Sequence, residues 1–582
     1  RKFLTLLTIL MLSGVFVFGQ NKTITGKVTG DDGSPLSDVS VMVKGTKIGT
    51  VTNAAGVYSL QVPSNSKVLV FSSVGMETFE VTIGNRNSID AVLSSSDESL
   101  NEVIINIPYG TIKKTSFTGS ENTVTTKTLE KQQVTNVTSA LEGLVPGIIS
   151  TNGGGAPGTG AGILVRGVGS INATSAPLYV LNGVPYDGSI SAISMDDIES
   201  VTVLKDATAS ALYGSRAANG VIMITTKKGK KGAPQVGVTF RQGFMSRGIP
   251  EYDRVDSKDY YELMWEAYRN SYFSQGNSMS ASGVLASNVL TSSSGLVYNA
   301  YNVPGNTLVD PVTGKLNPNA KLLWNESWED ALFRTAPRIN ANVNVSGATD
   351  KVDYYFSAGY LSEDGIVRFS GYKRYDLRLN VNMQATDWLK TGLNLDGALA
   401  ENKSVPSGGT ATTNPFYFTR QMGPIYPVYQ HDLTTGAFVI DPTTGEKKLD
   451  WGVPGQMGTR PYAGNSNLLG SLNLDDRSNN LFNGNANTYA EIKFTKELSF
   501  KATLGVNFYT SNGTTYQNNQ FGDAAPSSPG AGDGGRSTKS NYTLTSLTAN
   551  QVLSYSKQFD KHDLRVLAGH ESYKFKDRNL AG

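Results

Sequence analysis

A glycine-rich run is the first feature of this sequence that could do chemistry, because backbone N–H groups in such loops can hold a phosphate. Residues 153–155 are all glycine, and Gly158, Gly160 and Gly162 follow. The nucleotide-binding form of this loop ends in Gly-Lys-Ser or Gly-Lys-Thr and leads into a helix. Neither feature is present, so the pattern favours a flexible loop over a nucleotide site.

Acidic and histidine side chains offer the next candidates. Asp196, Asp197 and Glu199 could exchange protons in acid–base catalysis, but Asp196 suits a turn that leads into a strand. The three histidines lack the spacing of metal ligands, and the chain has no cysteine. The sequence therefore predicts no enzyme, no metal site and no cofactor.

Composition excludes further classes. The 582 residues include 51 Lys and Arg against 49 Asp and Glu, a net charge of +2. This balance provides no basic surface of the kind that binds nucleic acid. At about 150 residues per domain, the length predicts several domains.

The first residues have the pattern of an export signal. Arg1 and Lys2 precede a mainly apolar stretch over residues 3–18, and Gly19 and Gln20 end it. This order predicts a secretory signal peptide at 1–20, since the stretch is short for a membrane span. An exported chain without cysteine suits an oxidising compartment.

Residues 21–95 predict a small β-sandwich. Short β-prone runs alternate with turns rich in Gly, Asp, Asn and Pro. The stretch "TGKVTGDDGSPLSDVSVMVKGTKIGTVTNAAGVYSLQV" resembles the carboxypeptidase-regulatory-like domain, an immunoglobulin-like module. This resemblance implies a folding or docking role rather than peptidase activity.

From residue 231 onward, apolar and polar residues alternate along segments of about ten residues, which is the length that a tilted transmembrane β-strand needs. Ile339, Ala341, Val343 and Val345 alternate with polar residues in one such segment. We expect nine strands, at 236–244, 338–345, 352–360, 375–384, 389–399, 486–494, 498–508, 544–555 and 564–570.

Loop lengths between these segments also alternate. Short turns at 347–351, 385–388, 495–497 and 558–562 contrast with loops at 247–337, 362–373, 402–485 and 511–540. Outer-membrane barrels have short periplasmic turns and long external loops. Plugged barrels have about 22 strands, so we expect residues 231–582 to be the N-terminal part of a truncated transmembrane β-barrel.

The segment at 115–230 carries the most specific resemblance. "GSINATSAPLYVLNGVPY" and "MDDIESVTVLKDATASALYGSRAANGVIMITTKKG" resemble the α/β plug domain of SusC-like TonB-dependent outer-membrane transporters (the SusC/RagA family), and "VTSALEGLVPGI" and "ILVRGVGS" fit the same plug. Asn182 and Leu144 depart from that pattern. The resemblance implies a structural role for Arg166, Gly167, Asp206, Tyr213, Gly214, Arg216 and Gly220. We expect Arg166 and Arg216 to bind wall carboxylates rather than substrate.

The linker at 96–114 resembles the segment through which these transporters are energised. The resemblance implies a TonB box at Leu100, Asn101, Glu102, Val103, Ile104 and Ile105, followed by a mobile connector at 113–131. An edge strand of the sandwich is the alternative. The implied partners are TonB with ExbB and ExbD in the inner membrane, a SusD-like surface lipoprotein and outer-membrane lipid.

The resemblance implies a TonB-dependent importer in the outer membrane of a Gram-negative bacterium. The expected substrate is an oligosaccharide or a peptide, and a secreted glycan-binding β-protein is the alternative. Two aromatic sets remain. Tyr354, Tyr360, Tyr375, Trp388, Tyr489 and Phe508 are expected at the membrane interface. Phe416, Tyr417, Phe418, Tyr426 and Tyr429 are expected either to stack on sugars or to pack the loop onto a partner.

Overall fold

The computed structural model describes most of the chain from Asn21 onward. The described ranges are 21–31, 33–64, 66–74, 76–94, 104–107, 110–113, 120–132, 134–151, 154–205, 211–409, 412–526, 534–560 and 562–582. The expected signal peptide, Leu100 to Val103 and Asp206 lie outside them. The chain forms two compact units, one mainly of residues before 105 and one mainly of residues 118–582.

The first unit is a sandwich of two small sheets. One sheet has the order β4 (Val57–Pro63), β1 (Asn21–Gly30), β7 (Ala91–Leu93), and the other has the order β3 (Gly49–Val51), β2 (Ser40–Val43), β5 (Val68–Ser72), β6 (Phe79–Thr82). Alternate residues of β1 point inward, so Ile24 and Val28 are fully buried with Val41, Leu69 and Phe71. The sandwich fold predicted from the sequence is confirmed.

The second unit begins with an α/β domain, which we call the plug. Its sheet has the order β10 (Glu121–Thr125), β15 (Ile198–Leu204), β16 (Val221–Thr226), β13 (Leu178–Leu181), β14 (Val184–Pro185). It also contains the hairpin of β11 (Ile148–Thr151) and β12 (Gly162–Val165), and the helices α2 (Thr126–Gln132) and α3 (Val137–Ala140).

The expected connector at 113–131 is wrong for its second half. Residues 121–132 form β10 and α2 instead, because Val124 and Leu129 are buried in the plug core. These two apolar side chains stand among Thr and Lys residues, which hid the amphipathic pattern.

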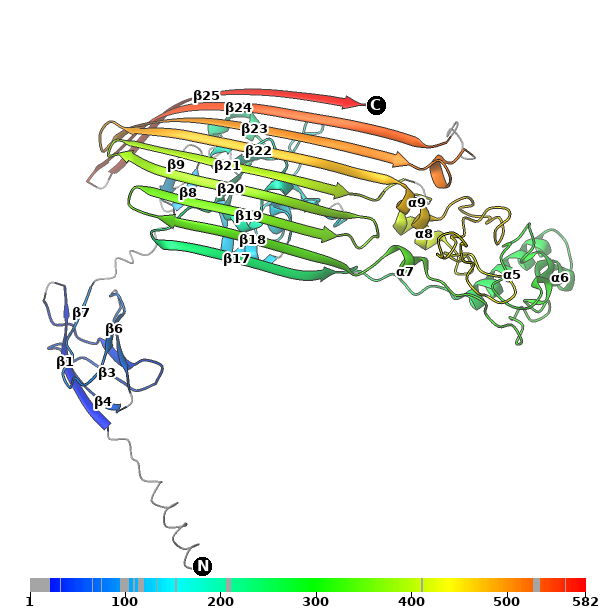
Figure 1. The fold of residues 1–582 in the computed structure, drawn as a ribbon, viewed down its shortest axis with the longest axis horizontal. Coiled ribbons are helices and arrows are strands. Elements are labelled where there is room, and N and C mark those ends of the chain that lie inside the picture. The colour runs from blue at the N-terminus through cyan, green and yellow to red at the C-terminus, as the bar shows by residue number, and fades with distance from the viewer. Residues whose placement is uncertain are drawn as a thin grey trace, which may run out of the picture. The chain divides into compact units, whose positions relative to one another are not determined.

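A single antiparallel sheet of nine strands, which we call the wall, follows the plug in this unit (Figure 1). Its strands pair in chain order and are 13 to 24 residues long. They are β17 (Gly232–Met245), β18 (Ala336–Ala348), β19 (Val352–Asp364), β20 (Gly371–Thr386), β21 (Leu389–Lys403), β22 (Asp476–Lys493), β23 (Leu498–Gln517), β24 (Arg536–Phe559) and β25 (His562–Ala581). All nine expected strands are present.

The two faces of the wall differ in polarity. In β20, Tyr375 and Leu377 are more than half exposed, whereas Arg374 and Arg378 are 3% exposed and face the plug. A sheet with apolar residues outward and polar residues inward matches a membrane barrel and inverts the arrangement of a water-soluble sheet. The fold class is confirmed as mainly β, with a sandwich, an α/β plug and a large antiparallel sheet.

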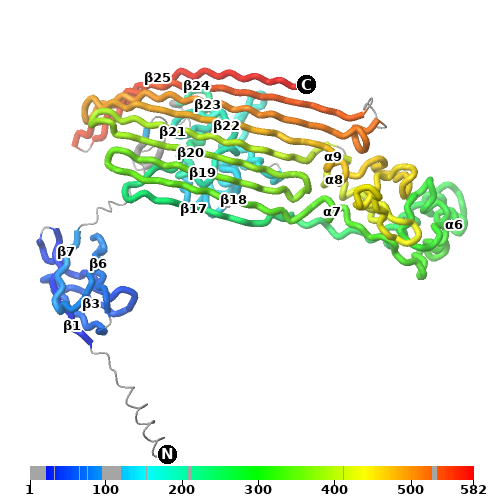
Figure 2. Tube along the Cα trace, viewed as in Figure 1, coloured from blue at the N-terminus to red at the C-terminus, as the bar shows by residue number. Residues whose placement is uncertain are grey.

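Two long loops fold together beyond one end of the wall. Figure 2 shows the green segment at 246–335 beside the yellow segment at 404–475. We call them the lobe, which contains α5 (Ser257–Ser274), α6 (Met279–Val289), α7 (Trp328–Leu332), α8 (Pro415–Gln421) and α9 (Leu468–Leu474). Its core combines side chains of both loops, including Trp265, Trp328 and Phe418. In the described part of the chain, no helix has the length and apolar character to cross a membrane.

Candidate functional site

The contact between plug and wall is the candidate site, and Arg378 lies at its centre. Its Nε is 3.2 Å from Oδ2 of Asp197 in the plug, and its Nη1 is 3.4 Å from Oδ1 of Asp396 in β21. Tyr355 of β19 donates a hydrogen bond of 2.9 Å to the other oxygen of Asp197. Arg378 and Asp197 are each 2% exposed, so one buried cation joins the two parts.

A second buried arginine lies two inward positions away on β20, with Asp376 between the two arginines. Arg374 binds Asp376 at 2.8 Å and donates to the carbonyl oxygen of Ser191 in the plug at 2.9 Å. Tyr372 donates to the same carbonyl at 3.1 Å. The wall therefore holds plug backbone as well as plug side chains.

The acidic pair considered for catalysis provides plug anchors instead. Asp196 and Asp197 lie in the 3₁₀ turn Met195–Asp197, directly before β15. Asp196 binds Arg241 of β17 at 2.6 Å and accepts from Asn340 of β18 at 2.8 Å. Because the wall supplies a cation to each, neither carboxylate is placed as a free proton acceptor.

Amide side chains complete this edge of the contact. Asn380 of β20 donates to Oγ1 of Thr226 at 3.0 Å and to the carbonyl oxygen of Lys227 at 2.8 Å. Asn182 binds Thr226 from within the plug. Asn182 and Gly183 have φ of 50° and 87° and form a two-residue hairpin turn that suits an Asn-Gly pair.

The other edge of the contact involves β24 and β25. Arg216 of the plug pairs with Glu571 and lies 4.5 Å above the ring of Tyr573. Tyr573 and Ser546 both donate to Oδ2 of Asp187 in the plug, at 3.0 and 2.6 Å.

Within the part of the plug that the structure describes, the remaining residues named from the resemblance do not contact the wall through the ion pairs given above. Arg166 is exposed, with a left-handed φ of 59°, and Gly167 follows with a φ of 99°. Tyr213 is buried, and Gly214 has a φ of 65°. Gly220 has a left-handed φ of 87°, and a Cβ there would lie 3.0 to 3.1 Å from Val165 and the Leu204 carbonyl, so both backbone and packing favour glycine.

Ile104 and Ile105 of the expected TonB box lie in β8 (Ile104–Ile107), which pairs with β9 (Gly110–Lys113). Gly110 lines a cavity of about 230 Å³ between plug and wall, beside Asn182, Asn382 and Lys501. Tyr489 lines this cavity too and donates to Asn382, so its expected place at the membrane interface is wrong.

One buried tyrosine of the plug keeps its proton at neutral pH. Burial, together with the nearby charge of Asp396, raises the pKa of Tyr186 in the plug well above its ordinary value. Its hydroxyl therefore stays protonated and donates to the Ser189 carbonyl at 2.9 Å. Among the described residues, no group of three or more acidic or histidine side chains could hold a metal ion.

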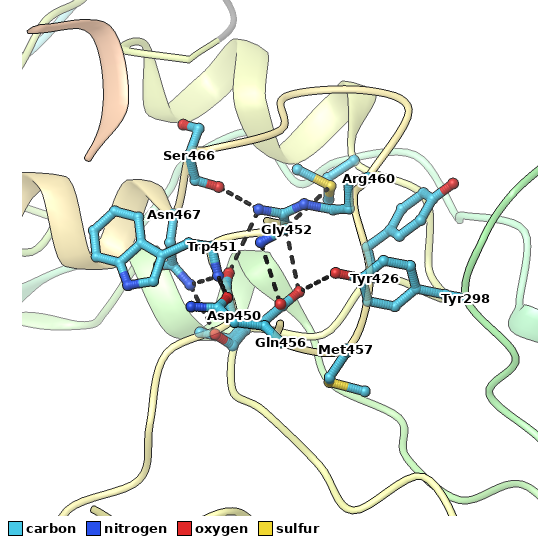
Figure 3. A network of polar contacts seen from close by, with 12 residues as sticks. Tyr298, Tyr426, Asp450, Trp451, Gly452, Gln456, Met457, Arg460, Ser466 and Asn467 are labelled. Carbon is cyan, nitrogen blue, oxygen red and sulfur yellow. Dashed lines mark hydrogen bonds and ion pairs between the residues drawn. The ribbon is translucent and has the colours of Figure 1, made fainter. Parts of the chain in front are cut away.

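The aromatic residues of the lobe form a core rather than an open platform. Phe418 and Tyr426 are at most 3% exposed, which contradicts both roles expected for them. Tyr426 packs edge-on against Tyr298, whose hydroxyl donates to Oδ2 of Asp450 at 2.8 Å. Asp450 pairs with Arg460, and both side chains are fully buried (Figure 3). Tyr417 is 46% exposed.

The buried wall arginines were missed as site residues, although a signal was present. Asp376 and Arg378 occupy successive polar positions of one predicted transmembrane strand, and Arg374 lies directly before its expected start. Charges at that depth need partners inside the protein. The spacing of these charged residues was enough to predict that β20 binds the plug.

A plug held by buried charges inside a sheet with an apolar outer face defines a plugged outer-membrane receptor. The profile of the TonB-dependent Receptor Plug Domain matches residues 113–221, and that of the CarboxypepD_reg-like domain matches residues 24–105.

Whole-chain comparisons agree with these domains. The chain is 30% identical to TonB-dependent receptor P3 of Formosa agariphila, over 97% of this chain and 49% of that protein. It is 28% identical to TonB-dependent receptor SusC of Bacteroides thetaiotaomicron, over 97% of this chain and 52% of that one. The RagAB peptide importer in its open-open state superposes with a TM-score of 0.63 at 25% identity, over 82% of this chain and 50% of that one.

We therefore place the chain with the SusC-like TonB-dependent receptors, and the resemblance found in the sequence is confirmed. The chain spans about half the length of the curated relatives it matches.

Proposed function

We propose that this protein imports a nutrient across the outer membrane of a Gram-negative bacterium, with the plug as its gate. The observation that carries the proposal is the polar contact centred on Arg378, which holds a separate domain against the inward face of the wall. A contact made of hydrogen bonds and ion pairs can exchange its partners for water. Displacing the plug would then open a path along the wall.

Energy would reach the plug through the segment that contains Ile104 and Ile105. An extended segment can add as a strand to the edge of a partner's sheet, with main-chain hydrogen bonds as the main attraction. TonB, powered by ExbB and ExbD, is the partner that the family implies. Because β8 pairs with β9, this hairpin would open before the segment is captured.

The substrate proposed is an oligosaccharide or a peptide, delivered by a SusD-like surface lipoprotein. SusC and the RagAB peptide importer are among the similar proteins, which supports this range of substrates. A secreted glycan-binding protein would have no use for an apolar outer face on the wall, so we do not favour that alternative. Transport without catalysis accounts for the described site.

A reversible covalent lock tests the gate. A Cβ on Gly505 of β23 would lie 3.4 Å from the Cβ of Val184 in the plug, close to the separation that a disulfide needs. The chain has no native cysteine to interfere. We expect the oxidised V184C/G505C variant of the full-length protein to lose substrate uptake, and a reductant to restore it.

A second cysteine pair provides the matched control. Gly513 and Ser540 lie on neighbouring wall strands, with a Cβ separation of 3.9 Å, and their disulfide would leave the plug free. Oxidised G513C/S540C should take up substrate normally. Uptake at the normal rate by oxidised V184C/G505C would show that the plug does not gate transport.

A further inference from the structure

The outer face of the wall carries positive charge directly beyond its apolar band. In β20, Lys373 lies on the same exposed face as Tyr375 and Leu377, and the positions between them face the plug. The strand register places Lys373 opposite Glu401 of β21, and Lys403 lies one outward position further along that strand.

Two neighbouring segments, one after α7 and one between β19 and β20, each add an arginine whose backbone is hydrogen-bonded to the other segment. The backbone N–H of Arg334 donates to Ile366 at 2.8 Å, and that of Arg368 donates to Leu332 at 2.9 Å. These bonds tie the tip between β19 and β20 to the end of α7. The same tip holds Phe369 with a left-handed φ of 67° and leaves its ring 40% exposed.

These four cations line one hollow of about 300 Å³, which we call the rim pocket. Its acidic residues are Asp364, 3.3 Å from Arg334, and Glu401, 3.6 Å from Lys403. Within the described residues, Arg368 and Lys373 form no ion pair. Four cations against two carboxylates leave the rim pocket with a charge of +2 and two cations free to bind a ligand.

The position of the rim pocket along the wall strands indicates which layer of the membrane it contacts. The rings of Tyr360 and Tyr375 pack at 5.0 Å on the outer face, and Tyr375 is two residues from Lys373. Two residues of a strand span about 7 Å. Aromatic residues at the end of an apolar band mark the headgroup level of a membrane. The rim pocket therefore lies at the level of lipid phosphates, with the apolar band beside it for acyl chains.

We propose that the rim pocket binds the phosphate group of an outer-leaflet lipid and so anchors this side of the wall. This inference rests on the proposed location of the protein in the outer membrane. It adds a lipid ligand, which transport of the substrate does not itself require. Charge complementarity carries it, because basic residues at the membrane surface attract anionic lipids. The planar guanidinium groups of Arg334 and Arg368 can bind phosphate oxygens through paired N–H groups.

Native mass spectrometry of the full-length protein in detergent micelles tests the proposal, with phosphatidic acid, diacylglycerol and inorganic phosphate as probes. We expect phosphatidic acid to bind far more tightly than the other two. R368Q/K373Q should weaken that binding about 30-fold, the equivalent of about 1 kcal/mol for each lost charge. The control K351Q/K496Q removes two exposed lysines from the short turns at the other end of the wall and should bind like the unmodified protein.

Equal lipid binding by R368Q/K373Q and by the control would overturn the proposal. Binding of inorganic phosphate as tight as that of phosphatidic acid would overturn the assignment to a lipid. Uptake by cells carrying R368Q/K373Q is measured separately. Lost lipid binding with normal uptake would support the rim pocket, whereas failure of the cysteine lock would affect only the proposed gate.

Discussion

Arg378 neutralises two carboxylates that belong to different parts of the molecule, and all three side chains are at most 10% exposed. Removing one partner of such a buried pair costs about 3–5 kcal/mol, because the other charge stays buried. We expect Arg378→Met to loosen the plug and to make cells carrying the full-length protein more sensitive to vancomycin, which a firmly docked plug should keep out.

Restoring charge balance provides the control for this change. Adding Asp197→Asn and Asp396→Asn to Arg378→Met removes the uncompensated charges, so resistance should partly return. Unchanged vancomycin sensitivity of R378M, at normal amounts in the outer membrane, would show that the Arg378 contact does not hold the plug closed.

His431 gives the lobe a dependence on pH. Burial opposes its charge, but hydrogen bonding by Glu326 and by the Gly436 carbonyl outweighs burial and Lys447, and the pKa is raised above 6.5. Its Nδ1 is 2.8 Å from that carbonyl, and its Nε2 is 3.5 Å from Glu326. The stabilisation is therefore complete below pH 6.5 and is lost as pH rises through the folded-state pKa.

Hydrogen exchange measures this effect. After correction for intrinsic rates, amides near His431 should be better protected at about pH 6 than at about pH 8. His431→Gln should remove the difference. A difference that persists in the variant would assign the pH dependence to another group.

At the scale of elements, β8 pairs with β9 and contains two of the six residues of the expected TonB box. Proline at Ile104 removes a backbone donor and restricts φ, which prevents regular strand pairing. We expect full-length Ile104→Pro to reach the outer membrane but to take up little substrate, and Ile104→Val to behave normally. Normal uptake by Ile104→Pro would show that this strand is not the coupling segment.

Alternation in the sequence predicted all nine wall strands, because outward apolar residues repeat every second position. It missed the outer ends of several strands. β22 begins at Asp476 and β24 at Arg536, well before the expected 486 and 544. These ends contain Ser, Thr and Asn on both faces, so strand pairing extends them without an apolar pattern.

The plug contacts were harder to predict from the sequence. Asp197 and Arg378 are 181 positions apart, and nothing in either local pattern identifies the other. The resemblance located the plug, and Arg216 lies against a wall carboxylate. The partners of Asp196, Asp187 and Ser191 depend on how the plug docks against the wall, and the sequence pattern of neither part specifies this.

The whole molecule has a direction, with the lobe at one end of the wall and short turns at the other (Figure 1). We expect the full-length protein to fractionate with the outer membrane. A protease site inserted in the exposed tip at 442–447 should be cut on intact cells, and the same site at 495–497 only after lysis. Cleavage at 495–497 on intact cells would reverse the proposed orientation.

The polar character of the contact between plug and wall has a consequence for the proposed import cycle, in which the plug leaves the wall and returns. A domain docked through hydrophobic surfaces would expose these surfaces to water on release, and it would then tend to aggregate or stay unfolded. Here the surfaces that separate carry carboxylates, guanidinium groups and amides, which water can solvate at small net cost. For the proposed gate, we therefore expect the plug to leave and return many times without a chaperone.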